Sequence, residues 1–182
     1  MKGHLHQDDI AKFLRLSAEE FSHYCRNLTD EQFFAQPKDK WSVAQQVKHL
    51  ITSARMSRLA YSLPRFMVRL IGGKPNRHSR SYDELVARYH TKLASGGRAS
   101  GRFVPKPIPA SYGKDKMMAQ FDQANERLVK CLVKRRTEQQ LDQYLAPHPL
   151  LGKITLRELG YFTIHHTHHH LASIKQLTGA GT

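Results

Sequence analysis

The chain has 182 residues, which is enough to bury the core of one domain of ordinary size, and we expect residues 1–182 to form a single domain. Its 29 Lys and Arg residues against 15 Asp and Glu residues give a net charge of +14, so anionic partners are favoured over cationic ones. Only two cysteines occur, Cys25 and Cys131, which excludes a disulfide framework and predicts a cytoplasmic protein in a reducing compartment.

The sequence opens with polar and charged residues, so no signal peptide is expected. Its most apolar region, residues 59–71, is interrupted by Pro64, Arg65 and Arg69. This region is too short to span a bilayer, and we predict no membrane partner.

Apolar residues recur at helical spacing from about residue 8 to residue 27, which predicts a first long helix. A second helix is predicted from Ser42 to Pro64, because Ser42 and Gln45 have the spacing of a capping box and proline interrupts helices. The segment RFMVRLIGG then continues the helical pattern as far as Gly72 and Gly73.

Residues 74–113 are rich in Gly, Ser and Pro and predict an irregular connection with one short helix, from Ser81 to about Leu93. Between Arg55 and Tyr112, twelve Lys and Arg residues stand against only two carboxylates. Such a basic insertion suits nucleic acid, a membrane surface or an anionic substrate. It contains no recognisable nucleic-acid module, so we expect a solvated loop, lid or substrate wall rather than a nucleic-acid site.

A third long helix is predicted from about Lys114 to Arg136, with TEQQLDQY adding a turn or two. The segment PHPLLGK, which contains His148, is expected to be a turn that leads into the last helix. That helix begins with a capping box, Thr155 and Glu158, and continues to Leu177. These elements predict an all-α fold, an up-and-down four-helix bundle with a long basic crossover between its second and third helices.

Five histidines occupy six positions of the last helix: His165, His166, His168, His169 and His170. Successive residues of a helix are rotated by about 100°, so His166 and His170 share the apolar face and His169 lies at its edge. His165 and His168 point away from this face and are expected to be solvated. Two imidazoles at i and i+4 can hold one metal ion, although ordinary core histidines have the same spacing.

The second helix contains one histidine, His49, on the face that it shares with Ser53, Met56, Ala60 and Leu63. A lone histidine on such a face is commonly a hydrogen-bonded core residue. Beside an inward pair of histidines on another helix, however, it is the candidate third ligand.

Two segments resemble the DinB/YfiT-like metalloenzyme superfamily. WSVAQQVKHL is similar to a signature in which Trp-Ser opens a helix and a histidine about two turns later binds metal. HPLLGKITLRELGYFTIHHTHHHLASI is similar to the family's final segment, where a His-Pro…Gly turn leads into a helix with His-x-x-His-His. The resemblance implies that His49, His166 and His170 are metal ligands with His169 beside them, and the extra histidines leave His169 open as a replacement ligand.

Three neutral imidazoles leave one or more positions of a divalent ion open, as in catalytic metal sites, and zinc or nickel suits them better than iron or manganese. Such an ion activates water or a thiol. The resemblance implies that the protein either hydrolyses a small substrate or transfers a low-molecular-weight thiol to it. It also implies that the protein forms a homodimer. Basic residues favour an anionic substrate, and no motif places a partner carboxylate near the histidines. Two alternatives remain open: a non-catalytic binding or stress-response protein that contacts nucleic acid through the insertion, and an inert bundle whose histidines pair with polar core groups.

Overall fold

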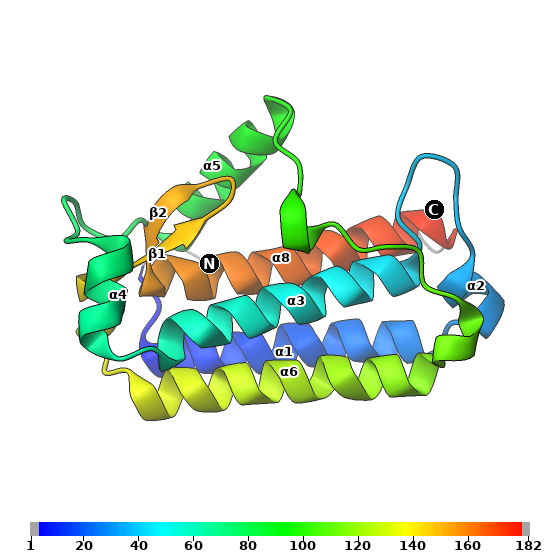
Figure 1. The fold of residues 1–182 in the computed structure, drawn as a ribbon, viewed down its shortest axis with the longest axis horizontal. Helices are drawn as coiled ribbons and strands as arrows, with labels where there is room; N and C mark the ends of the chain where they lie inside the picture. The colour runs from blue at the N-terminus through cyan, green and yellow to red at the C-terminus, as the bar shows by residue number, and fades with distance from the viewer. Residues whose placement is uncertain (1–3, 180–182) are drawn as a thin grey trace.

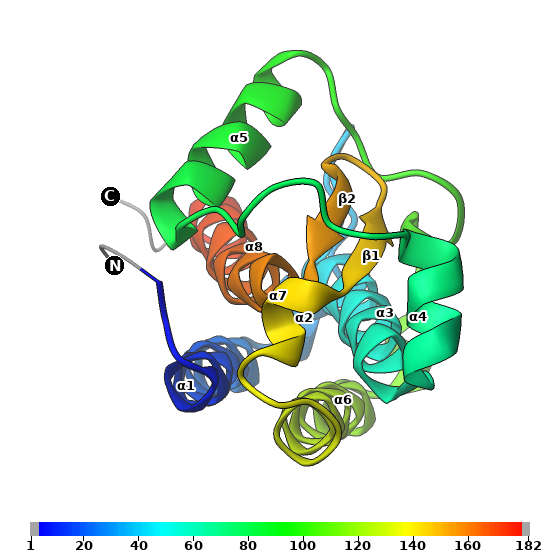
Figure 2. The ribbon, with the colours of Figure 1, turned by 90° about the vertical axis from the view of Figure 1, so that its left-hand side faces the viewer.

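The computed structural model describes residues 4–179, and most of these residues are helical. Four long helices, α1 (Gln7–Arg26), α3 (Val43–Ser62), α6 (Lys114–Arg135) and α8 (Leu156–Leu177), lie side by side along the long axis of the molecule (Figure 1). Figure 2 views them nearly end-on: α1 contacts α6 and α8, and α3 contacts the same two helices. The predicted all-α class is thus confirmed in the sense of a mainly helical fold. None of the described helices has the length and apolar character needed to cross a membrane.

Reciprocal caps begin several helices at the predicted residues. The Ser42 hydroxyl accepts from the backbone N–H of Gln45 at 3.2 Å, and the Gln45 side chain accepts from Ser42 N–H at 2.9 Å. The same box opens α2 (Asp30–Phe34), α5 (Tyr82–Ala94) and α8. Each box satisfies two backbone donors that a helix leaves unpaired at its start, so these helix starts follow from local sequence.

The core lies between the four long helices. Phe21 of α1 and Phe121 of α6 are fully buried, with their ring centroids 4.8 Å apart. Gly160 allows α8 to approach α1 closely, because a Cβ at this position would lie 2.7 Å from Cγ2 of Ile10. This close packing gives α8 a fixed rotation about its axis, and that rotation decides which histidines face α3.

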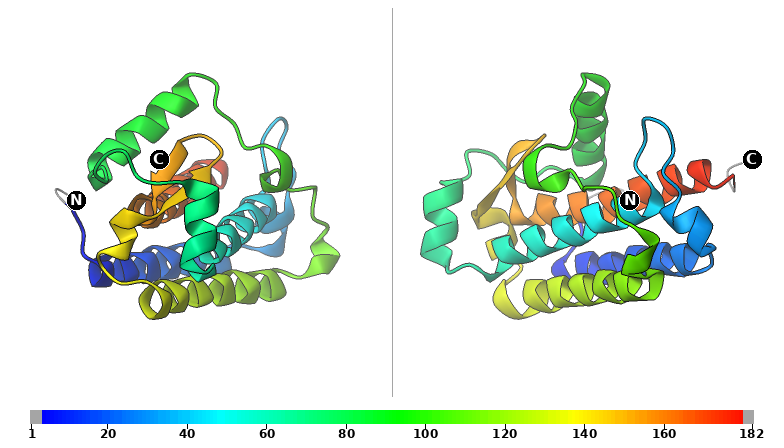
Figure 3. Two further views of the ribbon diagram at one scale, coloured as in Figure 1. Left: turned by 60° about the vertical axis from the view of Figure 1, so that its left-hand side comes forward. Right: turned by 45° about the vertical axis from the view of Figure 1, so that its right-hand side comes forward.

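The basic insertion is tied to α8 instead of lying free in solvent. Its helix α5 lies over α8, as Figure 3 shows from two further sides, and Tyr89 of α5 packs edge-on against Phe162 of α8 at 5.3 Å. The buried carboxylate of Glu158 accepts from both terminal nitrogens of Arg77, at 2.6 and 2.8 Å, and from the backbone N–H of Arg80 at 2.7 Å. The rest of the insertion carries two short 3₁₀ turns, η1 (Gly101–Phe103) and η2 (Ala110–Tyr112).

The turn expected within residues 147–153 is present at residues 149–151, and it closes a β-hairpin whose two short strands the sequence did not predict. After the short helix α7 (Gln140–Gln143), strand β1 (Leu145–His148) pairs antiparallel with β2 (Gly152–Thr155). Nδ1 of His148 accepts from the backbone N–H groups of Leu150 and Leu151, at 3.2 and 3.1 Å, and so closes the turn. Strands of four residues have too little alternation to be recognised in a sequence.

A further short helix, α4 (Arg65–Gly72), follows α3 after Pro64 and stands outside the four long helices, against β1 (Figures 2 and 3). Proline at the junction removes a backbone donor and disfavours helical geometry in the residue before it, which separates α4 from α3.

Candidate metal centre

Three imidazole rings from two helices converge in the interior. His49 comes from α3, and His166 and His170 come from successive turns of α8; all three side chains are buried. Nε2 of His166 lies 3.0 Å from Nε2 of His49 and 3.2 Å from Nε2 of His170. One ring nitrogen from each residue lies within 4.8 Å of those of the other two. The structure therefore brings together the three histidines that the sequence proposed as ligands.

The outer nitrogens of these rings have hydrogen-bond partners that orient the inner ones. Nδ1 of His49 lies 2.7 Å from the carbonyl oxygen of Phe103, which can only accept, so Nδ1 carries the proton of the neutral ring. Nδ1 of His170 lies 2.9 Å from Oε1 of Gln46, and the Gln46 amide is oriented by its Nε2, which donates to the carbonyl of Trp41 at 3.4 Å. Both rings thus turn an unprotonated Nε2 inward, which is the form that binds a metal.

Burial keeps these imidazoles neutral. It lowers the pKa of His166 and His170 well below the ordinary histidine value, and the neighbouring imidazoles lower it further. For His49 burial also lowers the pKa, against the opposing effect of the Phe103 carbonyl. Inward Nε2 lone pairs at these distances repel one another unless a cation or a proton lies between them. The donor set, its protonation and its spacing therefore fit one divalent transition-metal ion.

The remaining histidines of α8 lie outside this cluster. His169 is at the edge, as predicted, and His168 is partly exposed, with its Nε2 4.0 Å from a carboxylate oxygen of Glu20. His165 corrects the prediction of a solvated side chain, because α5 covers it: the rings of His90 and His165 are 5.0 Å apart. Within the described residues its Nε2 is buried without a hydrogen-bond partner, and burial lowers its pKa to about 4.

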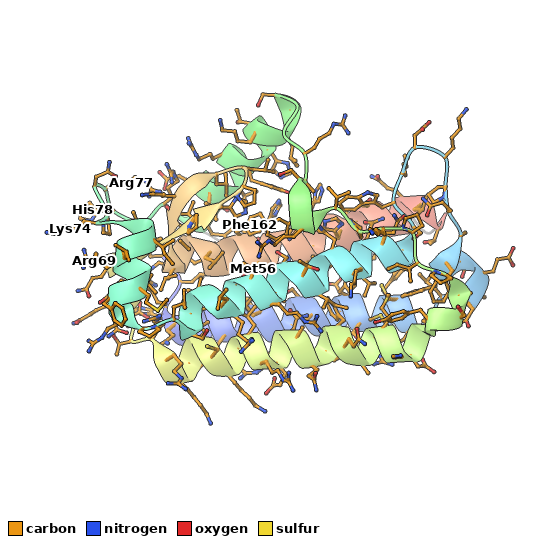
Figure 4. The ribbon with its side chains drawn as sticks, viewed as in Figure 1. Met56, Arg69, Lys74, Arg77, His78 and Phe162 are labelled. Carbon is orange, nitrogen blue, oxygen red and sulfur yellow. The ribbon has the colours of Figure 1, made fainter. Side chains whose placement is uncertain are left out.

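A cavity of about 1110 Å³ adjoins the three rings. Met56 of α3 and Phe162 of α8 line it near the middle of the molecule (Figure 4), and the Phe162 ring stacks on His166 at 4.7 Å. Most of the lining is apolar, and its cationic side chains are Lys40, Arg98 and Arg102. Asp39 is the one carboxylate among the described residues that line it, in keeping with the absence of a motif for a partner base.

The residues that form hydrogen bonds with the three rings or cover them were not recognised in the sequence. Phe103 belongs to the insertion, and its contribution is a backbone carbonyl, which leaves no signal in residue type. Gln46 was detectable in principle, since it precedes His49 by three residues and therefore faces the same side of α3. Trp41 covers the cluster, with its ring 5.1 Å from His49 and nearly parallel to His170 at 6.4 Å.

His148 is a further residue of the cavity wall with a defined protonation state. Because its Nδ1 accepts two backbone N–H groups, the neutral ring carries its proton on Nε2. Burial lowers its pKa to about 4, so the ring is neutral at physiological pH. It is therefore a neutral N–H donor at the wall of the cavity.

Replacing Gln46 with methionine should weaken metal binding roughly 10- to 100-fold, because His170 loses the acceptor that keeps its Nε2 unprotonated and aimed inward. Titration calorimetry with zinc on the metal-free protein measures this. Gln46→Glu is the matched control, since it keeps an acceptor oxygen at the same distance along the side chain. Equal affinity of the methionine variant and the wild type would show that this hydrogen bond does not orient the ligand.

The family model for the DinB superfamily matches residues 14–174. No curated protein matches the chain. The matched range spans most of the chain and includes the capping box of α3, the hairpin and all three converging histidines. The chain therefore belongs to the DinB superfamily.

Proposed function

We propose that the protein is a metal-dependent enzyme of the DinB type, in which His49, His166 and His170 hold one zinc or nickel ion within an up-and-down bundle of α1, α3, α6 and α8. The observation that carries this proposal is the convergence of the three Nε2 atoms. In His49 and His170 the other ring nitrogen, Nδ1, faces a protein acceptor. A bound ion would supply activation of water or a thiol and polarisation of a carbonyl, for hydrolysis or thiol transfer.

The cavity lining supports a small substrate that has both an apolar part and an anionic group. Apolar side chains from α3, α8 and the hairpin provide the larger part of the wall, and Arg98 and Arg102 of the insertion provide positive charge. Nη1 of Arg102 lies 3.7 Å from the sulfur of Met56, so this guanidinium reaches over the cavity from the insertion to α3. Trp41 shields the rings of His49 and His170 from water on one side.

His148 is our candidate for the group that positions the substrate. With Nδ1 engaged by the hairpin turn, its Nε2–H can donate to a carbonyl or other oxygen of the substrate without giving up the proton. A neutral donor suits a site that also contains several cationic side chains, because it adds no further charge to the cavity wall.

The contacts of the insertion favour this function over a non-catalytic nucleic-acid-binding protein. Phe103 accepts from a ring of the cluster, and Arg98 and Arg102 line the cavity beside it. The basic segment thus contributes to the interior site, which a separate nucleic-acid surface would not require.

Elemental analysis of protein purified without a histidine tag or a nickel column tests the proposal. We expect about one zinc or nickel ion per chain, removable by a chelator. Re-addition at about 100 times the dissociation constant should add about 2.7 kcal/mol to the free energy of unfolding. For a chain of this size that corresponds to a rise of roughly 5–10 °C in melting temperature. A folded protein with neither stoichiometric metal nor a thermal shift would contradict the proposal.

Activity assays then separate the two reaction types. The loaded protein is assayed with chromogenic esters and amides, and with low-molecular-weight thiols and an electrophilic acceptor. In whichever assay responds, His148→Asn should lower turnover while leaving the metal content unchanged. Asparagine retains an acceptor for the backbone N–H groups of Leu150 and Leu151 but lacks the Nε2–H donor.

A further inference from the structure

Helix α4 exposes nearly all of its large apolar side chains. The exposed fractions are 72% for Phe66, 36% for Met67, 84% for Leu70 and 48% for Ile71. We call these four residues the α4 patch. Half of the eight exposed large apolar side chains in the described part of the chain belong to this one helix of eight residues. Such a concentration on a short element marks a surface that binds something.

The orientation of α4 is held by its opposite side, so the patch cannot simply turn inward. Val68 is 3% exposed, and Gly72 lies so close to the backbone carbonyl of Leu145 that a Cβ there would clash with it. The guanidinium of Arg69 lies over the ring of Tyr144, 5.3 Å from its centroid. These contacts fix α4 against β1 with the α4 patch facing outward.

The stretch of chain that contains the α4 patch is basic. No Asp or Glu occurs between Asp39 and Asp83, a span that contains nine Lys and Arg residues. Arg65 and Arg69 belong to α4, and Lys74 follows it; Figure 4 shows Arg69 and Lys74 at this end of the molecule, together with Arg77. Arg77 is engaged by Glu158, whereas Arg65 and Lys74 are exposed. The α4 patch is therefore an apolar surface within a cationic rim.

This combination points to an anionic lipid surface as the occupant. A second copy of the chain would place the same cationic rim against itself across a two-fold axis, where like charges repel. Nucleic acid would neutralise the rim but would offer no apolar medium to Phe66 and Leu70. Anionic lipid satisfies both parts, because apolar side chains enter the headgroup and acyl boundary while Lys and Arg pair with the headgroups.

We propose that the protein docks on anionic lipid membranes through the α4 patch and its rim of Arg65, Arg69 and Lys74. The sequence predicted no membrane partner because no segment is long enough to span a bilayer, but peripheral docking needs only one amphipathic helix at the surface. Leu59 and Ile71 are exposed and also line the cavity, so the docked face adjoins the cavity. Resting on the proposed function, this arrangement suits an amphiphilic substrate taken from the membrane surface.

Flotation of the full-length protein with vesicles tests the docking. The vesicles contain phosphatidylcholine alone or phosphatidylcholine mixed with phosphatidylglycerol, and the protein is kept metal-free with a chelator, so that the result does not depend on the metal centre. We expect binding to the anionic vesicles only, and weaker binding at high salt. Phe66→Ser combined with Leu70→Ser should weaken binding at least roughly tenfold.

Matched variants separate the patch from general effects. Leu16→Ser with Val133→Ser removes two apolar side chains of 48% and 44% exposure on α1 and α6, and should leave binding unchanged. Arg65→Gln with Lys74→Gln should weaken binding more than Lys134→Gln with Arg135→Gln at the end of α6. Melting curves establish that every variant is folded.

Three results would overturn the docking proposal. The first is the absence of binding to anionic vesicles by the folded wild-type protein. The second is binding to anionic vesicles that survives the Phe66 and Leu70 substitutions, because such binding would be unspecific attraction between charges. The third is a homodimer, seen by light scattering, that these substitutions dissociate, since the patch would then be covered by a second copy.

Discussion

Replacing His166 with alanine should abolish stoichiometric metal binding while leaving the helical content unchanged. Nε2 of His166 lies 3.0 Å from that of His49 and 3.2 Å from that of His170, so its loss leaves only two of the three converging ligands. Removing an outer-shell partner typically costs 10- to 100-fold in metal affinity, and the loss of a direct ligand should cost more than about 100-fold. Titration calorimetry and elemental analysis measure the effect, and circular dichroism checks the fold.

His168→Ala is the control for this experiment. It removes an imidazole from the same helix, two residues away, whose side chain is 43% exposed and lies outside the cluster. Metal content and affinity should match the wild type. If His166→Ala retained one tightly bound ion per chain while His168→Ala lost it, the ligands would have been assigned to the wrong face of α8.

Replacing Glu158 with alanine should lower the free energy of unfolding by about 3–5 kcal/mol, because it leaves the charge of Arg77 without its partner and removes the reciprocal cap of α8. The corresponding fall in melting temperature is roughly 10 °C. Thermal and denaturant unfolding of the metal-free protein measure the change without a contribution from bound metal.

The control is Glu126→Ala, which breaks the exposed pair between Glu126 and Lys130 on α6. Their side chains are 47% and 62% exposed, and such a pair contributes less than about 1 kcal/mol. If both variants lost the same free energy of unfolding, the buried contacts of Glu158 would contribute no more to stability than an exposed ion pair.

The Glu158 contribution should also depend on pH in a defined direction. Burial tends to raise its pKa, but hydrogen bonds from Arg77 and from the backbone of Arg80 and Thr155 outweigh burial and lower it from 4.5. The unfolded chain therefore binds the proton more readily, so the stabilisation is complete above that value and declines as the pH falls below it. The difference in the free energy of unfolding between the wild type and Glu158→Ala should accordingly become smaller at acidic pH.

Much of the candidate site could be read from local sequence. The capping box of Thr155 and Glu158 predicted the start of α8, and a count of about 100° per residue along this helix placed His166 and His170 on its apolar face. The same count placed His49 on the face of α3 that lines the cavity with Met56 and Leu63. These relationships extend over three or four residues, where helix geometry alone determines which side chains lie together.

Other features escaped the sequence because they depend on contacts between distant segments. His165 faces away from the core on the helix wheel, yet α5 covers it, so its predicted solvation was wrong. The hairpin β1–β2 forms because its short strands pair with each other and pack against α4, and neither strand has a recognisable pattern alone. The helical pattern of residues 65–72 did not tell which side of α4 is buried, and only its packing on β1 leaves Phe66 and Leu70 exposed.

The sequence by itself determined the long helices, the starts that have capping boxes, and the inward face of each helix on which His49, His166 and His170 lie, because caps and helical periodicity act between neighbours in the chain. Only the tertiary structure decided which atom of each ring points inward. The acceptor for Nδ1 of His49 comes from a residue 54 positions away, and the acceptor for Nδ1 of His170 from one 124 positions away. No local rule connects residues so far apart; the packing of the insertion and of α3 against α8 brings them within hydrogen-bonding distance.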